Sequence, residues 1–180
     1  MSDDDAHGDR DAGSDDDPTA DADDDLTHTD DAGDVQMVNV GNKPESARRA
    51  VARGTIHLTE STVEAVRGNE VRKGDVLATA RIGAVQAVKH TWETIPMCHQ
   101  IPITNVDTEF EVSDDRIDLE VAVETTGKTG CEMEALEGVT TGLNVVWDMV
   151  KAAEKDATGG YPNTRITDVE VVTKDKTVLE

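Results

Sequence analysis

One long periodic segment, residues 126–156, constrains the fold of this chain more than any other feature. It begins with a turn between Gly127 and Gly130. Apolar residues then recur every three to four positions, at Leu136, Val139, Leu143, Val146, Val150 and Ala153. This spacing is that of one face of an α-helix. We therefore predict a long amphipathic helix over residues 132–156, on which Asp148 and Lys151 are close enough to approach each other.

Residues 1–34 have a composition unlike the rest of the chain. They contain fifteen Asp and one strongly basic residue, Arg10, and so carry a formal charge of −14 out of −22 for the whole chain. Such a segment cannot bury enough apolar surface to offset the entropy that it would lose on ordering. We predict a disordered acidic tail over residues 1–34 and one folded domain over residues 35–180.

The composition of residues 35–180 excludes several classes of protein. The domain keeps a net charge of −8, which argues against a nucleic-acid partner because phosphate binding needs a basic face. The chain shows no signal peptide and no apolar run long enough for a membrane span, so we expect a soluble, cytoplasmic protein without a membrane partner. Only 2% of residues are aromatic, so the core should be aliphatic. An Asp-rich surface with few lysines also fits a protein that works in high salt.

The remaining patterns predict an alternation of helices and strands. A proline at a first-turn position predicts a short helix over residues 44–52, and a capping-box pattern predicts another over residues 61–67. Strands are expected at residues 55–58, 105–112, 116–124 and 166–173, and a second long helix at residues 76–95. This order predicts an α+β fold of the ferredoxin-like, split βαβ type, with an antiparallel sheet, two long helices on one face and short N-terminal helices.

Two polar clusters lie at the ends of the helix expected over residues 76–95. Lys73-Gly74-Asp75 precedes it, and its plain structural explanation is a turn with Asp75 as the helix cap. Cys98-His99 follows it in a loop between two prolines. A loop histidine is most simply a solvated side chain, although a rigid loop can also present a ligand.

Two further clusters belong to the segment 126–156. Gly127-Lys128-Thr129-Gly130 lacks the spacing of a phosphate-binding P-loop. Asp148 and Lys151 could form an ordinary surface ion pair, worth a few tenths of a kcal/mol. Taken together, however, the lysines, the histidine and the carboxylates of the four clusters suit proton transfers on a charged small molecule.

Longer strings of the sequence resemble the cyclic pyranopterin monophosphate synthase family, the molybdenum cofactor biosynthesis protein C family. The strings are MVNVGNKPESARRAVARG, KGDVLATARIGAVQAVKHTWETIPMCHQIPI, TGKTGCEMEALEGVTTGLNVVWDMVKAAEKD and VVTKDK. They occur in the family's order over residues 37–176, which is the whole predicted domain.

The resemblance implies a specific reaction and assembly. Members of the family convert a 3′,8-cyclised dihydro-GTP, made by a radical SAM GTP cyclase, into cyclic pyranopterin monophosphate with release of pyrophosphate. The family is a lyase, has a ferredoxin-like fold and assembles as a homohexamer, a trimer of dimers. It uses no metal or organic cofactor, so its only expected ligand is the small-molecule substrate.

The resemblance also implies roles for individual residues. The catalytic residues would be Lys73, Asp148 and Lys151, in which the carboxylate orients the ammonium group and burial tunes the proton affinity. The substrate-binding residues would be Met97, Cys98, His99, Glu132, Met133, Glu134, Lys174 and, across the subunit boundary, Arg48. The chain departs from the family where a glycine-rich GGKSG-type loop is replaced by Asp175-Lys176-Thr177. Lys176 is an approximate substitute for that loop.

Two alternatives from other functional classes remain open at this point. Cys98, His99 and Cys131, with nearby acids, could form a metal-binding or sensor site, although the cysteines lack the spacing of a zinc site and are most simply free thiols. The acidic tail could instead bind a basic partner, which would make the protein a scaffold. Chelation distinguishes the first alternative and deletion of residues 1–34 distinguishes the second.

Overall fold

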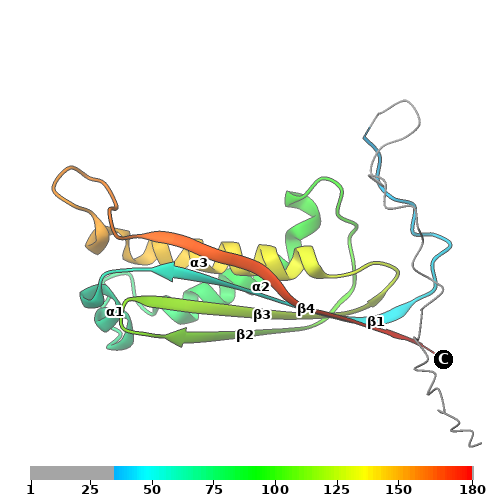
Figure 1. Cartoon of the computed structure of the whole chain (residues 1–180), viewed down its shortest axis with the longest axis horizontal. Coiled ribbons are helices and arrows are strands. Elements are labelled where there is room, and N and C mark those ends of the chain that lie inside the picture. Colours follow the sequence, from blue (N-terminus) through cyan, green and yellow to red (C-terminus); the bar gives the residue numbers. More distant parts are fainter. Residues whose placement is uncertain (1–34, 180) are drawn as a thin grey trace, which may run out of the picture. The chain divides into compact units, whose positions relative to one another are not determined.

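The computed structural model describes residues 35–179, and those from Met37 onward form one compact unit. The predicted acidic tail lies outside the described residues. The elements run in the order β1 (Ser46–His57), α1 (Glu60–Arg67), α2 (Val76–Thr94), β2 (Ile103–Val112), β3 (Arg116–Gly127), α3 (Glu132–Glu154) and β4 (Arg165–Val178) (Figure 1). No helix among the described residues is both long and apolar enough to span a membrane.

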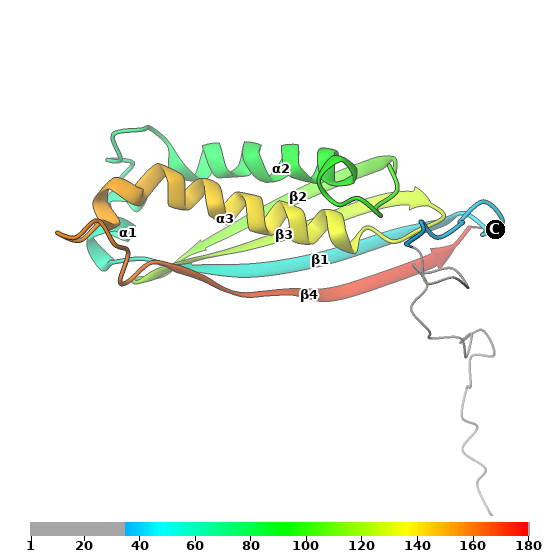
Figure 2. The same cartoon turned by 90° about the horizontal axis from the view of Figure 1, so that it is seen from above.

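The four strands form one antiparallel sheet in the order β2-β3-β1-β4. Both long helices, α2 and α3, lie on the same face of this sheet (Figure 2). The predicted α+β class with an antiparallel sheet is therefore confirmed. The strands predicted at residues 105–112 and 116–124 are present as β2 and β3, and both long helices lie within two residues of their predicted bounds.

The predicted helix over residues 44–52 is wrong, because this segment is the first half of β1. β1 pairs with β3 on one side and with β4 on the other along nearly its whole length. Ala50, Ala52 and Ile56 are at most 1% exposed, so the strand lies at the centre of the core. Pairing on both sides and burial override the helical propensity of its Ala- and Arg-rich sequence. Only one short helix, α1, therefore precedes α2 in the described chain.

The α1 helix begins at Glu60, but its predicted capping box does not form. Its N-cap is Thr59, whose side chain makes no capping hydrogen bond. The Thr59 hydroxyl and amide instead donate to the Glu154 carboxylate, at 2.7 and 3.1 Å, and the Thr164 hydroxyl donates to it at 2.7 Å. Burial raises the pKa of Glu154, whereas hydrogen bonds from Thr62, Thr164 and Thr59 lower it. The hydrogen bonds have the larger effect together, so the pKa is lowered overall. The buried carboxylate ties the end of α3 to α1 and to the segment before β4.

The α3 helix packs closely because small residues face its neighbours. A Cβ atom at Gly138 would lie 2.8 Å from a Val88 methyl group of α2, and one at Gly142 would lie 2.5 Å from a Leu119 methyl group of β3. Both distances are shorter than real Cβ contacts, so glycine permits this approach. The predicted apolar stripe is buried at Val139, Leu143, Val146 and Val150, half-buried at Leu136 and exposed at Ala153. The close packing of α2 and α3 thereby fixes the positions of the polar side chains at the two ends of α3.

Candidate functional site

The predicted catalytic residues Lys73, Asp148 and Lys151 come together in one cluster, which we call the Asp148 triad. The Lys73 ammonium nitrogen lies 2.7 Å from Asp148 Oδ2 and 2.6 Å from the Asp148 carbonyl oxygen. The Lys151 ammonium nitrogen lies 2.7 Å from Asp148 Oδ1. One carboxylate therefore bridges two lysines, one from the same helix and one from the turn before α2.

Local structure places Lys73 beside α3. Gly74 has a φ of 102°, which lets the chain turn sharply between Lys73 and α2. Asp75 caps α2 by accepting a hydrogen bond from the Ala78 amide at 2.9 Å, as predicted. The motif therefore has two separate parts. Asp75 caps the helix α2, and Lys73 contributes its ammonium group to the Asp148 triad.

The Asp148 triad is a fixed, solvent-exposed charge cluster. The side chains of Lys73, Asp148 and Lys151 are 43%, 56% and 47% exposed. Hydrogen bonds from Lys151 and Lys73 lower the pKa of Asp148 to about 2, and the Asp148 carboxylate raises the pKa of Lys151. In the single chain, the Asp148 carboxylate is the main cause of the Lys151 pKa shift, and burial opposes it by lowering that pKa to a smaller extent.

Tyr161 also lies near the triad and was not singled out from the sequence. Its phenol group adds to the upward shift of the Lys151 pKa. Its ring packs edge-on against Trp147 with the centroids 5.7 Å apart, and the Lys155 ammonium group lies 5.9 Å from its centroid. The sequence offered one hint of this residue: Tyr161 is the only tyrosine of the chain, and it follows a Gly-Gly loop.

The predicted substrate-binding residues gather at the other end of α3, around its first turn. Glu132 Oε1 lies 2.6 Å from the Lys174 ammonium nitrogen of β4. Burial raises the pKa of Glu132, but the hydrogen bond from Lys174, the residue's own backbone amide and the charges of Lys174 and Arg48 produce a net decrease. Arg48 donates from Nε to the Ser46 hydroxyl at 2.9 Å. Two cations from adjacent strands therefore act on the same carboxylate.

Glu134 differs from Glu132 because it is almost fully buried, at 4% exposure. Burial raises the pKa of Glu134 to about 7. The charge of Glu132 adds to this increase, and the hydrogen bond from the residue's own backbone amide opposes it. This carboxyl group can therefore exchange a proton near neutral pH. Met133, between these two residues, is 40% exposed.

The loop with Met97, Cys98 and His99 approaches the same end of α3. Burial and the charge of Glu134 raise the pKa of Cys98. Burial and the charges of Glu132 and Glu134 raise the pKa of Cys131 to about 11, and its thiol donates to the Val123 carbonyl oxygen at 3.3 Å. Both cysteines are free, as expected, and neither environment favours a thiolate at neutral pH.

The two groups of predicted site residues are far apart in one chain. Glu132 and Asp148 both belong to α3 and are sixteen residues apart, which corresponds to about 24 Å along the axis. Lys73 contacts the Asp148 end, whereas Arg48 and Lys174 lie at the Glu132 end. A single chain thus separates the predicted residues into two groups, the Asp148 triad and the group of Glu132, Lys174 and Arg48, to which we refer as the Glu132 half-site.

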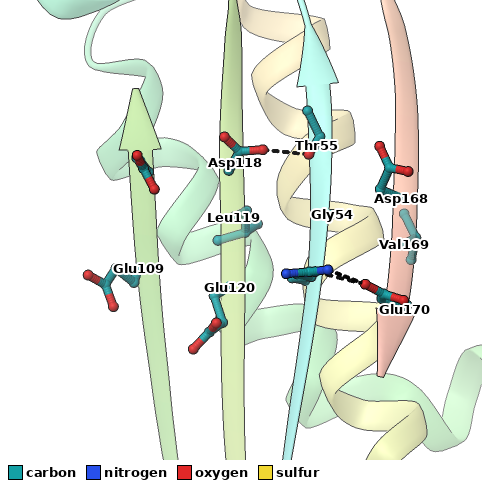
Figure 3. Close-up of a pocket in the computed structure, with 11 residues that line it drawn as sticks. Gly54, Thr55, Glu109, Asp118, Leu119, Glu120, Asp168, Val169 and Glu170 are labelled. Carbon is teal, nitrogen blue, oxygen red and sulfur yellow. Dashed lines mark hydrogen bonds and ion pairs between the residues drawn. The ribbon is translucent and has the colours of Figure 1, made fainter. Parts of the chain in front are cut away.

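Neither group coincides with a hollow of about 610 Å³ on the open face of the sheet (Figure 3). Its charged lining is mostly acidic and consists of Arg53, Glu109, Glu111, Asp118, Glu120, Asp168 and Glu170. Arg53 pairs with Glu170 at 2.6 Å, but Glu109 and Glu120 are directly opposed across β2 and β3. This surface is unsuited to an anionic ligand. In residues 35–179, no group of three or more His, Cys, Asp or Glu side chains has the placement of a metal site.

Comparison with known proteins identifies the family. Residues 37–177 match the MoaC family. A Halobacterium salinarum protein named "Probable cyclic pyranopterin monophosphate synthase" is 76% identical over 157 residues, covering 87% of this chain and 96% of the relative. A Natronomonas pharaonis protein of the same name is 73% identical over 157 residues, covering 87% and 98%.

A more distant relative has a slightly different name. The Methanothermobacter thermautotrophicus "Probable cyclic pyranopterin monophosphate synthase accessory protein" is 52% identical over 154 residues, covering 86% of this chain and 96% of the relative. The two more similar relatives come from halophilic archaea, which supports the expectation of a protein adapted to high salt. Because the family match spans most of the chain and the relatives are covered over nearly their whole length, the chain belongs to the MoaC family.

Proposed function

We propose that the protein is a cyclic pyranopterin monophosphate synthase, a lyase of molybdenum cofactor biosynthesis. Its substrate is the 3′,8-cyclised dihydro-GTP supplied by a radical SAM GTP cyclase, and its products are cyclic pyranopterin monophosphate and pyrophosphate. Family membership and the synthase names of the relatives support this role. The bridged Asp148 triad is the structural observation that carries the proposal, because it places two proton-transfer groups on one carboxylate.

The chemistry follows from the placement of these groups. Lys73 and Lys151 are the two proton-transfer groups, one as donor and the other as acceptor, and Asp148 holds both side chains in position. No metal or organic cofactor takes part in these steps.

The complete site is shared between two subunits. The half-site at Glu132 binds substrate through Arg48, Glu132, Glu134, Lys174 and the loop of Met97, Cys98 and His99, with Met133 beside it. The separation of about 24 Å along α3 supports this arrangement, because the two groups of one chain are too far apart to surround the same small molecule. The assembly is a homohexamer made of three such dimers and works in the cytoplasm. The strand order β4-β1-β3-β2, with two long helices on one face, supports a ferredoxin-like fold.

The direct test is to incubate purified protein with the cyclised GTP intermediate in high salt. We expect stoichiometric formation of cyclic pyranopterin monophosphate and pyrophosphate, unchanged after treatment with a chelator. A protein that is folded and hexameric but forms neither product would overturn the proposal. Product formation that stops on chelation and returns with a metal would support the metal-site alternative instead.

A further inference from the structure

Trp147, Lys151 and Lys155 form one row along the C-terminal half of α3. Neighbours in this row are four positions apart, so they lie on the same face of the helix, one turn from each other. Side chains of a helix lean toward its N-terminus, which directs the Lys151 stem over the turn that carries Trp147 and Asp148. Its ammonium group accordingly lies 2.7 Å from Asp148 Oδ1.

Tyr161, in the loop that follows α3, contacts both ends of this row. Its ring packs edge-on against Trp147 with the centroids 5.7 Å apart, and the Lys155 ammonium nitrogen lies 5.9 Å from the centroid of the same ring. Lys151 is the middle member of the row, so a ring that reaches both outer members lies next to it. The phenol group's upward effect on the Lys151 pKa agrees with this placement. The Lys151 side chain thus has Asp148 at its tip and Tyr161 beside it.

The loop that carries Tyr161 is held on both sides of that residue. Before Tyr161, the Asp156 carboxylate accepts a hydrogen bond from the Gly160 amide at 2.9 Å, and the Asp156 amide donates to the Gly160 carbonyl oxygen at 3.0 Å. After Tyr161, the Thr164 hydroxyl donates to the buried Glu154 carboxylate of α3 at 2.7 Å. The fold therefore holds the ring against α3 before any ligand binds, so little entropy remains to be lost there on binding.

We propose that Tyr161 is a positioning residue for Lys151, whose ring keeps the Lys151 side chain at the Asp148 triad while its amine is uncharged. A proton donor is uncharged after the transfer and a proton acceptor is uncharged before it, so Lys151 is a neutral amine at one stage in either part. At that stage the charge of Asp148 no longer attracts it. Contact with a ring does not depend on charge and persists. This inference rests on the proposed function and adds Tyr161 to the residues that serve the reaction.

Steady-state kinetics with the cyclised GTP intermediate separates positioning from substrate binding. Tyr161→Leu should lower kcat about tenfold and leave KM within about twofold, because the ring acts on Lys151 and not on the substrate. Tyr161→Phe keeps the ring and should retain at least about half of the wild-type kcat. Asn163→Ala, which changes an exposed side chain of the same loop, is the matched control and should stay within about twofold.

Three kinetic outcomes would overturn the proposal. A raised KM with unchanged kcat in Tyr161→Leu would mean that the residue binds substrate directly. An equal loss of kcat in Tyr161→Phe would mean that the hydroxyl group and not the ring is required. An equal loss in Asn163→Ala would assign the effect to the loop as a whole. Circular dichroism and oligomeric mass check that each variant is folded.

Chemical labelling tests the same contact without turnover. Acetic anhydride modifies uncharged, accessible amines, and peptide mass spectrometry of the purified full-length protein measures the rate at each lysine. In Tyr161→Leu, acetylation of Lys151 should become about threefold faster or more, because its stem regains the freedom that the ring restricts. Lys128, which lies before the other end of α3, is the internal reference and should keep its wild-type rate.

The labelling result also separates this inference from the proposed function. Asp156→Ala frees the loop but keeps the ring, so it should accelerate Lys151 labelling less than Tyr161→Leu does, and it replaces that variant if Tyr161→Leu does not assemble. Unchanged Lys151 labelling would overturn the positioning role even where kcat falls. A wild-type protein that does not turn over the intermediate would overturn the function, whereas selectively faster labelling of Lys151 would still support the contact with Tyr161.

Discussion

The two ends of α3 carry acids with opposite behaviour. Near the C-terminal end, the exposed Asp148 is bound by two lysines, and its pKa is lowered to about 2. In the first turn, Glu134 is almost fully buried, and burial raises its pKa to about 7. The Asp148 triad therefore holds fixed charge throughout the neutral range, and the Glu132 half-site contains the group that can change its charge there. The same helix thus supplies a rigid electrostatic element and a pH-sensitive one.

The largest effect is expected from removing either lysine of the Asp148 triad. Lys73→Ala and Lys151→Ala should each reduce kcat by about 10²- to 10⁴-fold or more, the usual contribution of a positioned proton-transfer group. Both side chains are about half exposed, so circular dichroism and the thermal midpoint should stay close to those of the wild type.

Lys155→Ala is the matched control, because Lys155 is an exposed lysine just after α3 that does not contact Asp148. It should keep activity within about twofold. Near-wild-type turnover in Lys73→Ala or Lys151→Ala would remove the catalytic role assigned to this end of the helix.

The second effect tests whether the two ends act in different subunits. Arg48→Ala and Asp148→Ala chains should each be inactive alone. In mixed dimers, one of the two shared sites would combine an intact Arg48 with an intact Asp148. Random mixing should therefore restore about a quarter of wild-type activity, because half of the dimers are mixed and each contains one intact site. Activity is measured after unfolding and refolding the chains together, and no recovery in proven hybrids would place each site within one subunit.

The sequence predicted the elements whose signal is local. The apolar stripes of α2 and α3 and the turn between β2 and β3 gave correct elements, because these patterns depend on neighbouring residues. The first half of β1 was missed because its Ala- and Arg-rich sequence lacks strand propensity, and its partners are more than 60 residues away in the chain. The C-terminal part of β4 was also missed, because an exposed edge strand of alternating Thr, Lys and Asp has no apolar periodicity.

The site follows the same division. The approach of Lys151 to Asp148 could be predicted from their helical spacing, and it is present at 2.7 Å. The approach of Lys73 depends on the packing of α2 against α3 across 75 residues of chain, so only the family resemblance indicated it. The protonation behaviour of Glu134 could not be predicted either, because it arises from burial in the folded core.

The third prediction concerns stability near Glu134. Its pKa is above the ordinary value of 4.5, so the folded protein binds a proton that the unfolded chain releases between about pH 4.5 and 7. The free energy of unfolding should therefore decrease over this range as pH rises, by on the order of 3 kcal/mol from this group, because each unit of pKa shift corresponds to about 1.4 kcal/mol. Glu134→Gln should remove that contribution, becoming more stable than the wild type at pH 8 but not at pH 4.5. Denaturant unfolding at the two pH values measures the difference, and parallel pH profiles would contradict the raised pKa.

The smallest effect compares one ion pair from each end of α3. Glu132 is 23% exposed and binds Lys174 at 2.6 Å, so Glu132→Gln should lower the thermal midpoint by about 2–4 °C, equivalent to about 1 kcal/mol. Because the pKa of Glu132 is lowered, the stability that it contributes is present above its ordinary value of 4.5 and is lost as pH falls. The difference in thermal midpoint between Glu132→Gln and the wild type should therefore shrink in acid.

Asp148→Asn should not change the midpoint, because water and salt already screen its exposed pairs, although it should abolish turnover. An equal loss of thermal stability in both variants would mean that the assembled enzyme buries the Asp148 triad as deeply as the Glu132 half-site.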